Sequence, residues 1–281
     1  MQNLAGQTKG LILSLQTKSP EKKKMLQVEA VTKTFDNLVA LDKVDLSLKQ
    51  GRSLALIGPA AAGKSVLLKC LVGLYAPSEG VIKIDGQEVG PAAQRPKELS
   101  HRIGMLFQQN ALFDSLSVWE NIAFRLMADG MGRRAARARA EDLLPKVGLP
   151  QENAILTPAD LSGGMQKRVG LARAIATDPD ILLLDNPTAG LDPILAAKID
   201  RMIKGLVDKR GATVISVIGN MVNIHDAYDE IAVLHEGCMR WHGNSEAARK
   251  DQNPWLRQLL EGRREGPIET IQSDIRIREA V

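Results

Sequence analysis

The stretch "SLALIGPAAAGKSVLLKCLVGL", residues 53–74, constrains the fold more than any other part of the chain. It begins with a short apolar run, continues through a loop with a glycine at each end, and finishes in a helical pattern. The loop fits the pattern G-x-x-x-x-G-K-[ST] between a predicted strand and a predicted helix. A Gly-rich turn without a ligand is the alternative, and the strand–loop–helix context favours a phosphate-binding loop.

The chemistry of this loop follows from its backbone. Its N–H groups turn inward around phosphate oxygens, and the helix N-terminus adds partial positive charge. We expect Lys64 to reach the β- and γ-phosphates and the Ser65 hydroxyl to bind Mg²⁺, while Ala60 to Ala62 offer few auxiliary hydrogen bonds. The candidate nucleotide-binding residues of the loop are Gly58, Pro59, Ala60, Ala61, Ala62, Gly63, Lys64, Ser65 and Val66.

A second apolar strand, in "ILLLDNPTAGLDP", residues 181–193, ends at Asp185. A carboxylate at the end of a buried strand can hold a Mg²⁺-bound water beside a phosphate loop. It can equally cap a helix. Together with the loop above, the pattern predicts that Asp185 completes a metal site.

The remaining pattern predicts a parallel α/β core with a helical insertion. Alternating apolar residues predict a hairpin over residues 25–51 and a further strand near 80–89. Residues from about 110 to 165 read as helical, with Ser117 and Glu120 placed as a capping box. We therefore divide the chain into a polar tail (1–24), a nucleotide-binding domain (25–243) and a C-terminal extension (244–281).

Composition narrows the class of protein. The chain has 281 residues, a net charge of +4 and only 3% aromatic residues, which argues against a nucleic-acid stacking surface. Cys70 and Cys238 lack metal-ligand spacing, so we expect a reduced compartment, the cytoplasm. No apolar run approaches the roughly 20 residues that span a bilayer, so any work at a membrane would be done from its surface.

The stretch "LSGGMQKRVGLARAIA", residues 161–176, resembles the signature that defines ATP-binding cassette (ABC) ATPases. Ser162, Gly163, Gly164 and Met165 precede a helix and would form a second phosphate grip at its N-terminus. The resemblance covers roughly residues 25 to 243. It implies a P-loop NTPase (RecA-like) α/β core with an antiparallel β subdomain and a helical insertion, ATP and Mg²⁺ as cofactors, and a dimer in which each phosphate loop faces the other chain's signature.

Further positions take their roles from this resemblance. Phe35, in "TKTFDN", matches the aromatic that stacks on adenine, although a core role is the alternative. Gln108, in "MLFQQN", matches the glutamine at the metal site. Asp192, in "AGLD", matches the aspartate that communicates across the dimer.

A closer resemblance is to the ATP-binding subunit of Mla-type phospholipid transporters. It rests on "GKSVLLKCLVGL", "QNALFDSLSVWENIAF" and "LSGGMQKRVGLARAIATDP", in which methionine follows the two glycines. It implies a membrane permease and a lipid-binding MCE protein as partners, and a place at the cytoplasmic side of the inner membrane.

Two positions depart from the family pattern. Asn186 stands where the catalytic glutamate is expected, and Asn has no basic group at neutral pH. Gly219, in "TVISVIGNM", stands where a switch histidine is expected, and His225 is interpreted as a surface residue rather than a displaced ligand. We therefore expect ATP and Mg²⁺ binding with weak hydrolysis.

Three interpretations remain open. The chain is an energy-coupling subunit of a lipid transporter, a nucleotide-binding regulatory or scaffold pseudo-ATPase, or the degenerate half of a heterodimeric ABC ATPase. A DNA-repair or chromosome-type ABC ATPase is disfavoured, since residues 108–162 leave no room for a coiled-coil or zinc insertion. Trp255, Leu256, Leu259 and Leu260 have helical spacing for a partner contact or, more simply, for packing on the chain's own core.

Overall fold

The computed structural model describes residues 24–109, 111–221 and 224–268, so nearly all of the predicted N-terminal tail and the end of the C-terminal extension lie outside the described residues. The strands are β1 (Lys24–Phe35), β2 (Leu38–Lys49), β3 (Ser53–Ile57), β4 (Glu79–Ile84), β5 (Gln87–Glu88), β6 (Ile103–Leu106), β7 (Ile181–Asp185), β8 (Thr213–Val217), β9 (Glu230–His235) and β10 (Cys238–Asn244). The helices are α1 (Lys64–Val72), α2 (Lys97–His101), α3 (Val118–Ala128), α4 (Arg133–Leu143), α5 (Gly163–Ile175), α6 (Pro193–Arg210), α7 (Ile224–Ala227), α8 (Ser245–Lys250) and α9 (Pro254–Glu261).

The main sheet has the strand order β10-β9-β3-β8-β7-β6. Its strands pair in parallel except β10, which pairs antiparallel with β9 at one edge. Strands β3, β7 and β8 are buried at every position, as expected for a parallel sheet covered on both faces. The predicted α/β core is confirmed.

Strand β3 contributes side chains to the hydrophobic clusters on both faces of the main sheet. Leu54 and Leu56 pack in the cluster around α1, while Ala55 and Ile57 pack with α7, α8 and α9. This alternation is the two-residue period of a strand. Helix α1 is thereby enclosed between the main sheet and a second sheet of order β2-β1-β4-β5, the predicted antiparallel subdomain.

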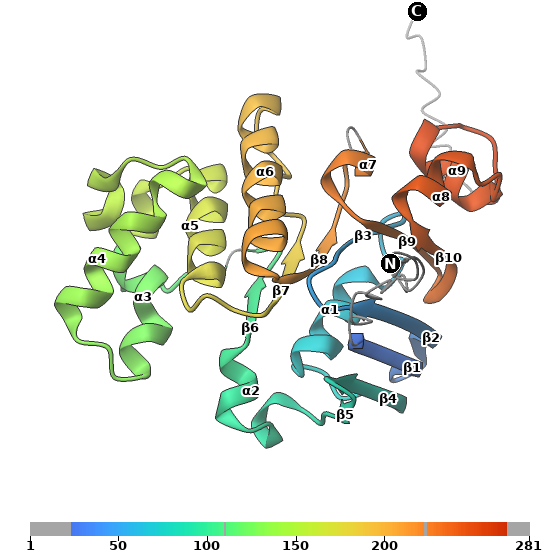
Figure 1. Ribbon diagram of the computed structural model, residues 1–281, viewed down its shortest axis with the longest axis horizontal. Coiled ribbons are helices and arrows are strands. Elements are labelled where there is room, and N and C mark those ends of the chain that lie inside the picture. Colours follow the sequence, from blue (N-terminus) through green and yellow to red (C-terminus); the bar gives the residue numbers. More distant parts are fainter. Residues whose placement is uncertain (1–23, 110, 222–223, 269–281) are drawn as a thin grey trace, which may run out of the picture.

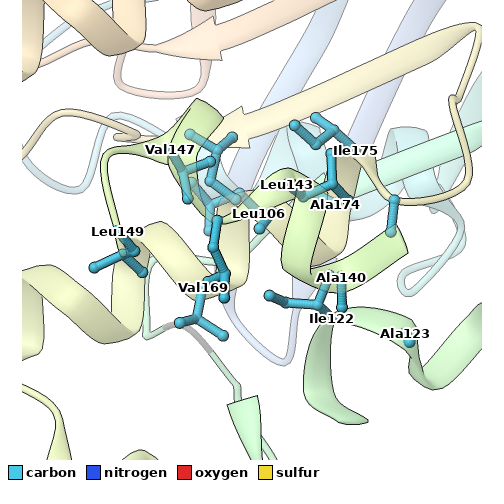
Figure 2. Packing of buried hydrophobic residues seen from close by; sticks show 14 of the residues in the cluster. Leu106, Ile122, Ala123, Ala140, Leu143, Val147, Leu149, Val169, Ala174 and Ile175 are labelled. Carbon is cyan, nitrogen blue, oxygen red and sulfur yellow. The ribbon is translucent and has the colours of Figure 1, made fainter. Parts of the chain in front are cut away.

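The helical insertion lies at the opposite end of the molecule from the antiparallel sheet (Figure 1). Figure 2 shows its core, in which side chains from α3, α4 and α5 point toward one another around Leu106 of β6. The predicted capping box is present, since the Ser117 and Glu120 side chains and backbones bond reciprocally at the start of α3. Helix α4 ends before Pro145, which cannot continue an α-helix, and a 3₁₀ turn follows.

Within the described part of the C-terminal extension, residues 244–268, helices α8 and α9 pack on the main sheet. Leu256 of α9 is fully buried beside β3 and β9, and Trp255, Leu259 and Leu260 pack partly buried against the same cluster. Of the two interpretations of this helix, packing on the chain's own core is confirmed. Among the described residues no helix combines the length and apolar character needed to cross a membrane.

Strand β6 and helix α5 approach each other closely at Gly104, and this contact can be tested by its effect on stability. A Cβ at Gly104 would lie 2.1 Å from the Ala174 carbonyl oxygen, so Gly104→Ala forces the strand away from the helix. We expect a loss of about 1–3 kcal/mol in the free energy of unfolding, the cost of overpacking a core. The measurement is urea unfolding with and without the substitution.

Gly205 in the middle of α6 is the matched control, because a Cβ there meets no atom within 4 Å. Gly205→Ala is expected to raise stability by about 0.5–1 kcal/mol, since alanine loses less entropy than glycine in a helix. Equal effects of the two substitutions would contradict the assigned contact.

Candidate functional site

The predicted site residues gather at one edge of the main sheet. Gly58, Gln108, Asp185 and Gly219 each lie at, or one or two residues beyond, the carboxyl end of a parallel strand. Asp185 of β7 pairs with Val217 of β8, which places the aspartate near Gly219. Carboxyl ends of parallel strands meet in a crevice where α/β proteins bind ligands. The topology therefore brings together motifs that are up to 160 residues apart in the chain.

The loop between β3 and α1 requires both of its glycines. Gly58 has φ 152° and Gly63 has φ 97°. A Cβ at Gly58 would lie 2.0 Å from the Leu234 carbonyl oxygen, and one at Gly63 would lie 2.5 Å from the Ala40 carbonyl oxygen. The loop thus curls in direct backbone contact with β9 and β2, which only glycine permits.

Lys64 lies across this loop at the first position of α1. Its Nζ donates to the Gly58 oxygen at 2.8 Å and to the Pro59 oxygen at 2.5 Å. Burial lowers the pKa of Lys64, and the negative charge of Asp185 opposes part of that shift. The ammonium group is therefore held beside the loop within the electrostatic reach of Asp185, where an anion would restore the stabilisation that burial removes.

Asp185 has the character of a magnesium ligand. It is 4% exposed, and among the described residues its carboxylate makes no hydrogen bond or ion pair. It nevertheless influences the pKa of both Lys64 and Lys167, so the two ammonium groups lie near it. A buried carboxylate without a partner, close to the phosphate loop through Lys64, fits a Mg²⁺ ion, which takes one or two protein oxygens and completes its shell with phosphates and water.

A cavity of about 500 Å³ opens over the loop. Its lining residues come from the loop, from the β1–β2 hairpin and from the β9–β10 turn: Phe35, Leu38, Val39, Ala40, Ala61, Ala62, Gly63, Lys64, Ser65, Val66, Glu236 and Gly237. Phe35 is half-buried and meets Tyr75 edge to face at 5.1 Å between ring centroids. Phe35 lines the cavity, and its stacking on a base stays a prediction.

Sequence reasoning missed five of the lining residues, namely Leu38, Val39, Ala40, Glu236 and Gly237. They lie far from the loop in the chain, and the contacts of Gly58 with Leu234, of Gly63 with Ala40 and of Ala62 with Gly237 bring them to it. The one local signal is the dipeptide Glu236–Gly237 between two apolar runs, which is typical of a hairpin turn.

Asn186 and Gly219, the two departures from the family pattern, lie side by side. A Cβ placed on Gly219 would be 3.5 Å from Asn186 Nδ2 and 3.6 Å from its Oδ1, which is ordinary van der Waals contact. Asn186 adopts φ 58°, a conformation that asparagine tolerates better than most residues. His225, interpreted from the sequence as a surface residue rather than a displaced ligand, is partly exposed on α7, with its Nδ1 3.2 Å from the Ser245 oxygen.

The signature lies apart from the chain's own phosphate loop. Ser162 caps α5, its Oγ accepting from the Met165 N–H at 3.3 Å, and is exposed to solvent. None of the described cavity-lining residues comes from Ser162, Gly163, Gly164 or Met165. The structure of one chain therefore leaves the signature open to another molecule.

Two contacts connect the signature helix with the loop after β7. Lys167 Nζ donates to the Ala189 oxygen at 3.1 Å, and a Cβ on Gly164 would lie 3.4 Å from a Leu191 methyl group. Asp192 follows in the same loop and caps α6, its carboxylate accepting from the Ile194 and Leu195 N–H groups. The predicted cross-dimer residue thus has a local helix-capping role within the chain.

The family model described as "ABC transporter" matches residues 41–189. The methionine import ATP-binding protein MetN of Desulfitobacterium hafniense is 36% identical over 228 residues, covering 79% of this chain and 67% of that protein. The probable ribonucleotide transport ATP-binding protein mkl of Mycobacterium leprae is 35% identical over 245 residues, covering 86% of this chain and 70% of that protein.

Solved structures agree with these matches. The ATP-binding cassette MJ0796, in a dimeric post-hydrolysis state bound to ADP and Pi, superposes with a TM-score of 0.74 at 31% identity and covers 79% of this chain and 99% of its own. The matches agree with the strand-end motifs, the phosphate loop and the α5 signature found in the structure. The chain therefore belongs to the family of ABC transporter ATP-binding subunits.

Proposed function

We propose that this subunit binds Mg·ATP in the cavity above the phosphate loop, hydrolyses it slowly, and powers phospholipid transport through a membrane permease and an MCE-type lipid-binding partner. The slow hydrolysis rests on one observation. The positions expected to activate water and to contact the terminal phosphate are occupied by Asn186 and Gly219, which lie so close that a Cβ placed on Gly219 would be 3.5 Å from Asn186 Nδ2.

The residues proposed to bind Mg·ATP have the side chains that the family pattern expects at their positions. Lys64 and the loop N–H groups would hold the phosphates, and Ser65, Asp185 and Gln108 would hold Mg²⁺, with Phe35 stacked on the base. When bound, Mg²⁺ neutralises charge on the phosphates. Because positioning and charge stabilisation dominate phosphoryl transfer, some turnover is expected without a carboxylate base.

The loss of the base has a predictable size. The Asn186 amide oxygen can orient a water molecule, but its side chain cannot accept a proton at neutral pH and is one carbon shorter than glutamate. Gly219 contributes no side-chain donor. Removing a general base typically slows a reaction by about 10²- to 10⁴-fold.

The exposed signature supports a dimer whose sites are shared between two chains. Ser162 and its two following glycines would grip the γ-phosphate bound to the partner. A symmetric dimer of this chain would contain two identical altered sites. A partner with a complete glutamate and histidine would keep one competent site, because this chain supplies an intact signature.

Restoring both positions tests the proposal. The double variant Asn186→Glu, Gly219→His is expected to release phosphate at least about ten-fold faster than the unaltered protein, since a general base alone is worth about 10²-fold or more. The ordinary contact distance at Gly219 leaves room for the histidine Cβ, whereas glutamate at φ 58° costs about 1 kcal/mol. The measurement is steady-state phosphate release by the purified complex.

Lys64→Ala in the restored background is the control, and it should return phosphate release to the background level. Unaltered protein that already matches the restored variant would show that Asn186 and Gly219 do not limit hydrolysis.

A second candidate function is a nucleotide-responsive regulatory subunit whose ATP-bound state is itself the signal. The presence of Asn186 and Gly219 at the two catalytic positions favours this function too. It predicts that the restored double variant loses its cellular function, because the signalling state is now consumed by hydrolysis, whereas an energy-coupling subunit would keep or gain function. Complementation of a deletion strain distinguishes the two.

Phospholipid as the cargo is supported by the resemblance of residues 63–74, 109–124 and 161–179 to Mla-type subunits. The relatives named above are described as acting in methionine import and ribonucleotide transport, so members of the family transport several kinds of cargo. A place on the cytoplasmic face of the inner membrane follows from the same proposal.

Affinity purification tests the partners. The tagged chain, isolated from detergent-solubilised membranes of its own cells, is expected to bring down an integral-membrane permease and an MCE protein, identified by mass spectrometry. A permease recovered with a soluble amino-acid-binding protein in place of the MCE protein would overturn the lipid assignment and leave the ATP-binding role intact.

A further inference from the structure

We propose that Glu236 is the side chain that recognises the nucleoside half of the bound nucleotide, accepting a hydrogen bond from a donor on the ribose or on the adenine. This inference rests on the proposed binding of ATP in the cavity above the phosphate loop. It concerns a residue outside every motif that the sequence singled out, at the turn between β9 and β10.

The first argument is the scarcity of polar side chains in the cavity. Among its described lining residues, Lys64, Ser65 and Glu236 carry the polar side chains, and the rest are apolar or glycine. Lys64 and Ser65 are assigned to the phosphates and Mg²⁺. Ligand sites of this kind fix orientation with a few placed polar groups in an apolar lining, so Glu236 is the side chain left to orient the nucleoside.

The second argument is that the turn is fixed to the phosphate loop. Glu236 and Gly237 have φ 49° and φ 73°, the pair of positive values that a tight hairpin turn requires. The Gly237 N–H donates to the Ala62 oxygen at 3.2 Å, and the Asp42 N–H donates to the Gly237 oxygen at 2.9 Å. The position of Glu236 relative to the phosphates is therefore set by backbone hydrogen bonds on both sides of the cavity.

Helix α9 supports the same turn from behind. His235, the residue before Glu236, is buried and stacks on Trp255 with 4.5 Å between ring centroids. The Arg240 guanidinium lies 4.9 Å from the Trp255 ring. This packing limits the freedom of the turn and reduces the entropy that a ligand contact at Glu236 would otherwise lose.

The third argument is that the Glu236 carboxylate has free acceptor capacity. Its partners within 4 Å are His235 Nδ1 at 3.6 Å and Arg240 Nη2 at 3.9 Å, and both distances are too long for a hydrogen bond. The side chain is 76% exposed. A carboxylate of this kind accepts hydrogen bonds and donates none, so its complement on a nucleotide is a ribose hydroxyl or an exocyclic amine.

The experiment compares nucleotides that differ by one donor. Calorimetric titration measures the affinities of the unaltered protein for ATP, 2′-deoxy-ATP, 3′-deoxy-ATP and inosine triphosphate, each with Mg²⁺. We expect ATP to bind about ten-fold more tightly than the analogue that lacks the recognised donor, because a hydrogen bond to a charged group is stronger than one between neutral groups. The analogue that loses affinity identifies the ribose or the base as the donor.

Glu236→Ala is expected to bring this ratio close to one while the affinity for the deficient analogue stays within about two-fold of its original value. Glu246→Gln, at an exposed carboxylate on α8 away from the cavity lining, is the matched control and should leave the ratio unchanged.

Two results would overturn the inference. If the unaltered protein binds all four nucleotides equally, Glu236 has no specificity role and the proposed ATP site is untouched. If Glu236→Ala tightens all four equally, the carboxylate acts only by repelling phosphate charge. An absence of any binding would contradict the proposed function itself.

Discussion

Direct backbone contact between the phosphate loop and its neighbours is the constraint on which the rest of this structure depends. The loop passes so close to the Leu234 and Ala40 carbonyl oxygens that neither Gly58 nor Gly63 has space for a side chain. Because the loop is pressed against β9 and β2 together, the main sheet, the antiparallel sheet and α1 share one core. The cavity is the space that remains where these three segments meet.

The same constraint explains why the groups proposed to bind phosphate and the two departures from the family pattern are separate parts of the structure. The groups assigned to phosphate binding belong to the loop and to the end of β7, and they are positioned by the sheet itself. Asn186 and Gly219 lie just beyond the strand ends, where a change of side chain leaves the buried strands untouched. Asparagine at a positive φ costs the backbone little. The position where a proton acceptor is expected can therefore carry asparagine without a change in the shape of the loop.

The charged side chains near the end of β7 also suit a phosphate ligand. Lys64 and Lys167 both lie within reach of the buried Asp185, and burial lowers the pKa of each. Two ammonium groups and one carboxylate in a partly desolvated crevice leave a net positive charge, which suits a polyphosphate with its metal ion. Lys167 belongs to the signature helix and bonds to the loop after β7, so the phosphate edge and the signature are mechanically connected within one chain.

The C-terminal helix adds a layer that the shared motifs do not describe. Leu256 completes a small core on the face of β3 opposite to α1, and Trp255 stacks on His235 next to the β9–β10 turn. This turn contributes Glu236 and Gly237 to the cavity wall. The extension therefore belongs to the structural support of the site as well as to the core.

The sequence by itself determined the phosphate loop, the buried strand ending at Asp185, the capping box at Ser117 and the α/β class, because each depends on residues that are neighbours in the chain. It also located Asn186 and Gly219, but only as two separate substitutions. Their proximity, which would place a Cβ on Gly219 3.5 Å from Asn186 Nδ2, was decided by the tertiary structure, which pairs β7 with β8. The cavity wall formed by Leu38, Val39 and Glu236 was decided there too. A local sequence pattern does not predict which distant turn will contact the phosphate loop. That contact depends on the order of strands in the sheet and on the glycines that allow two backbones to come into contact.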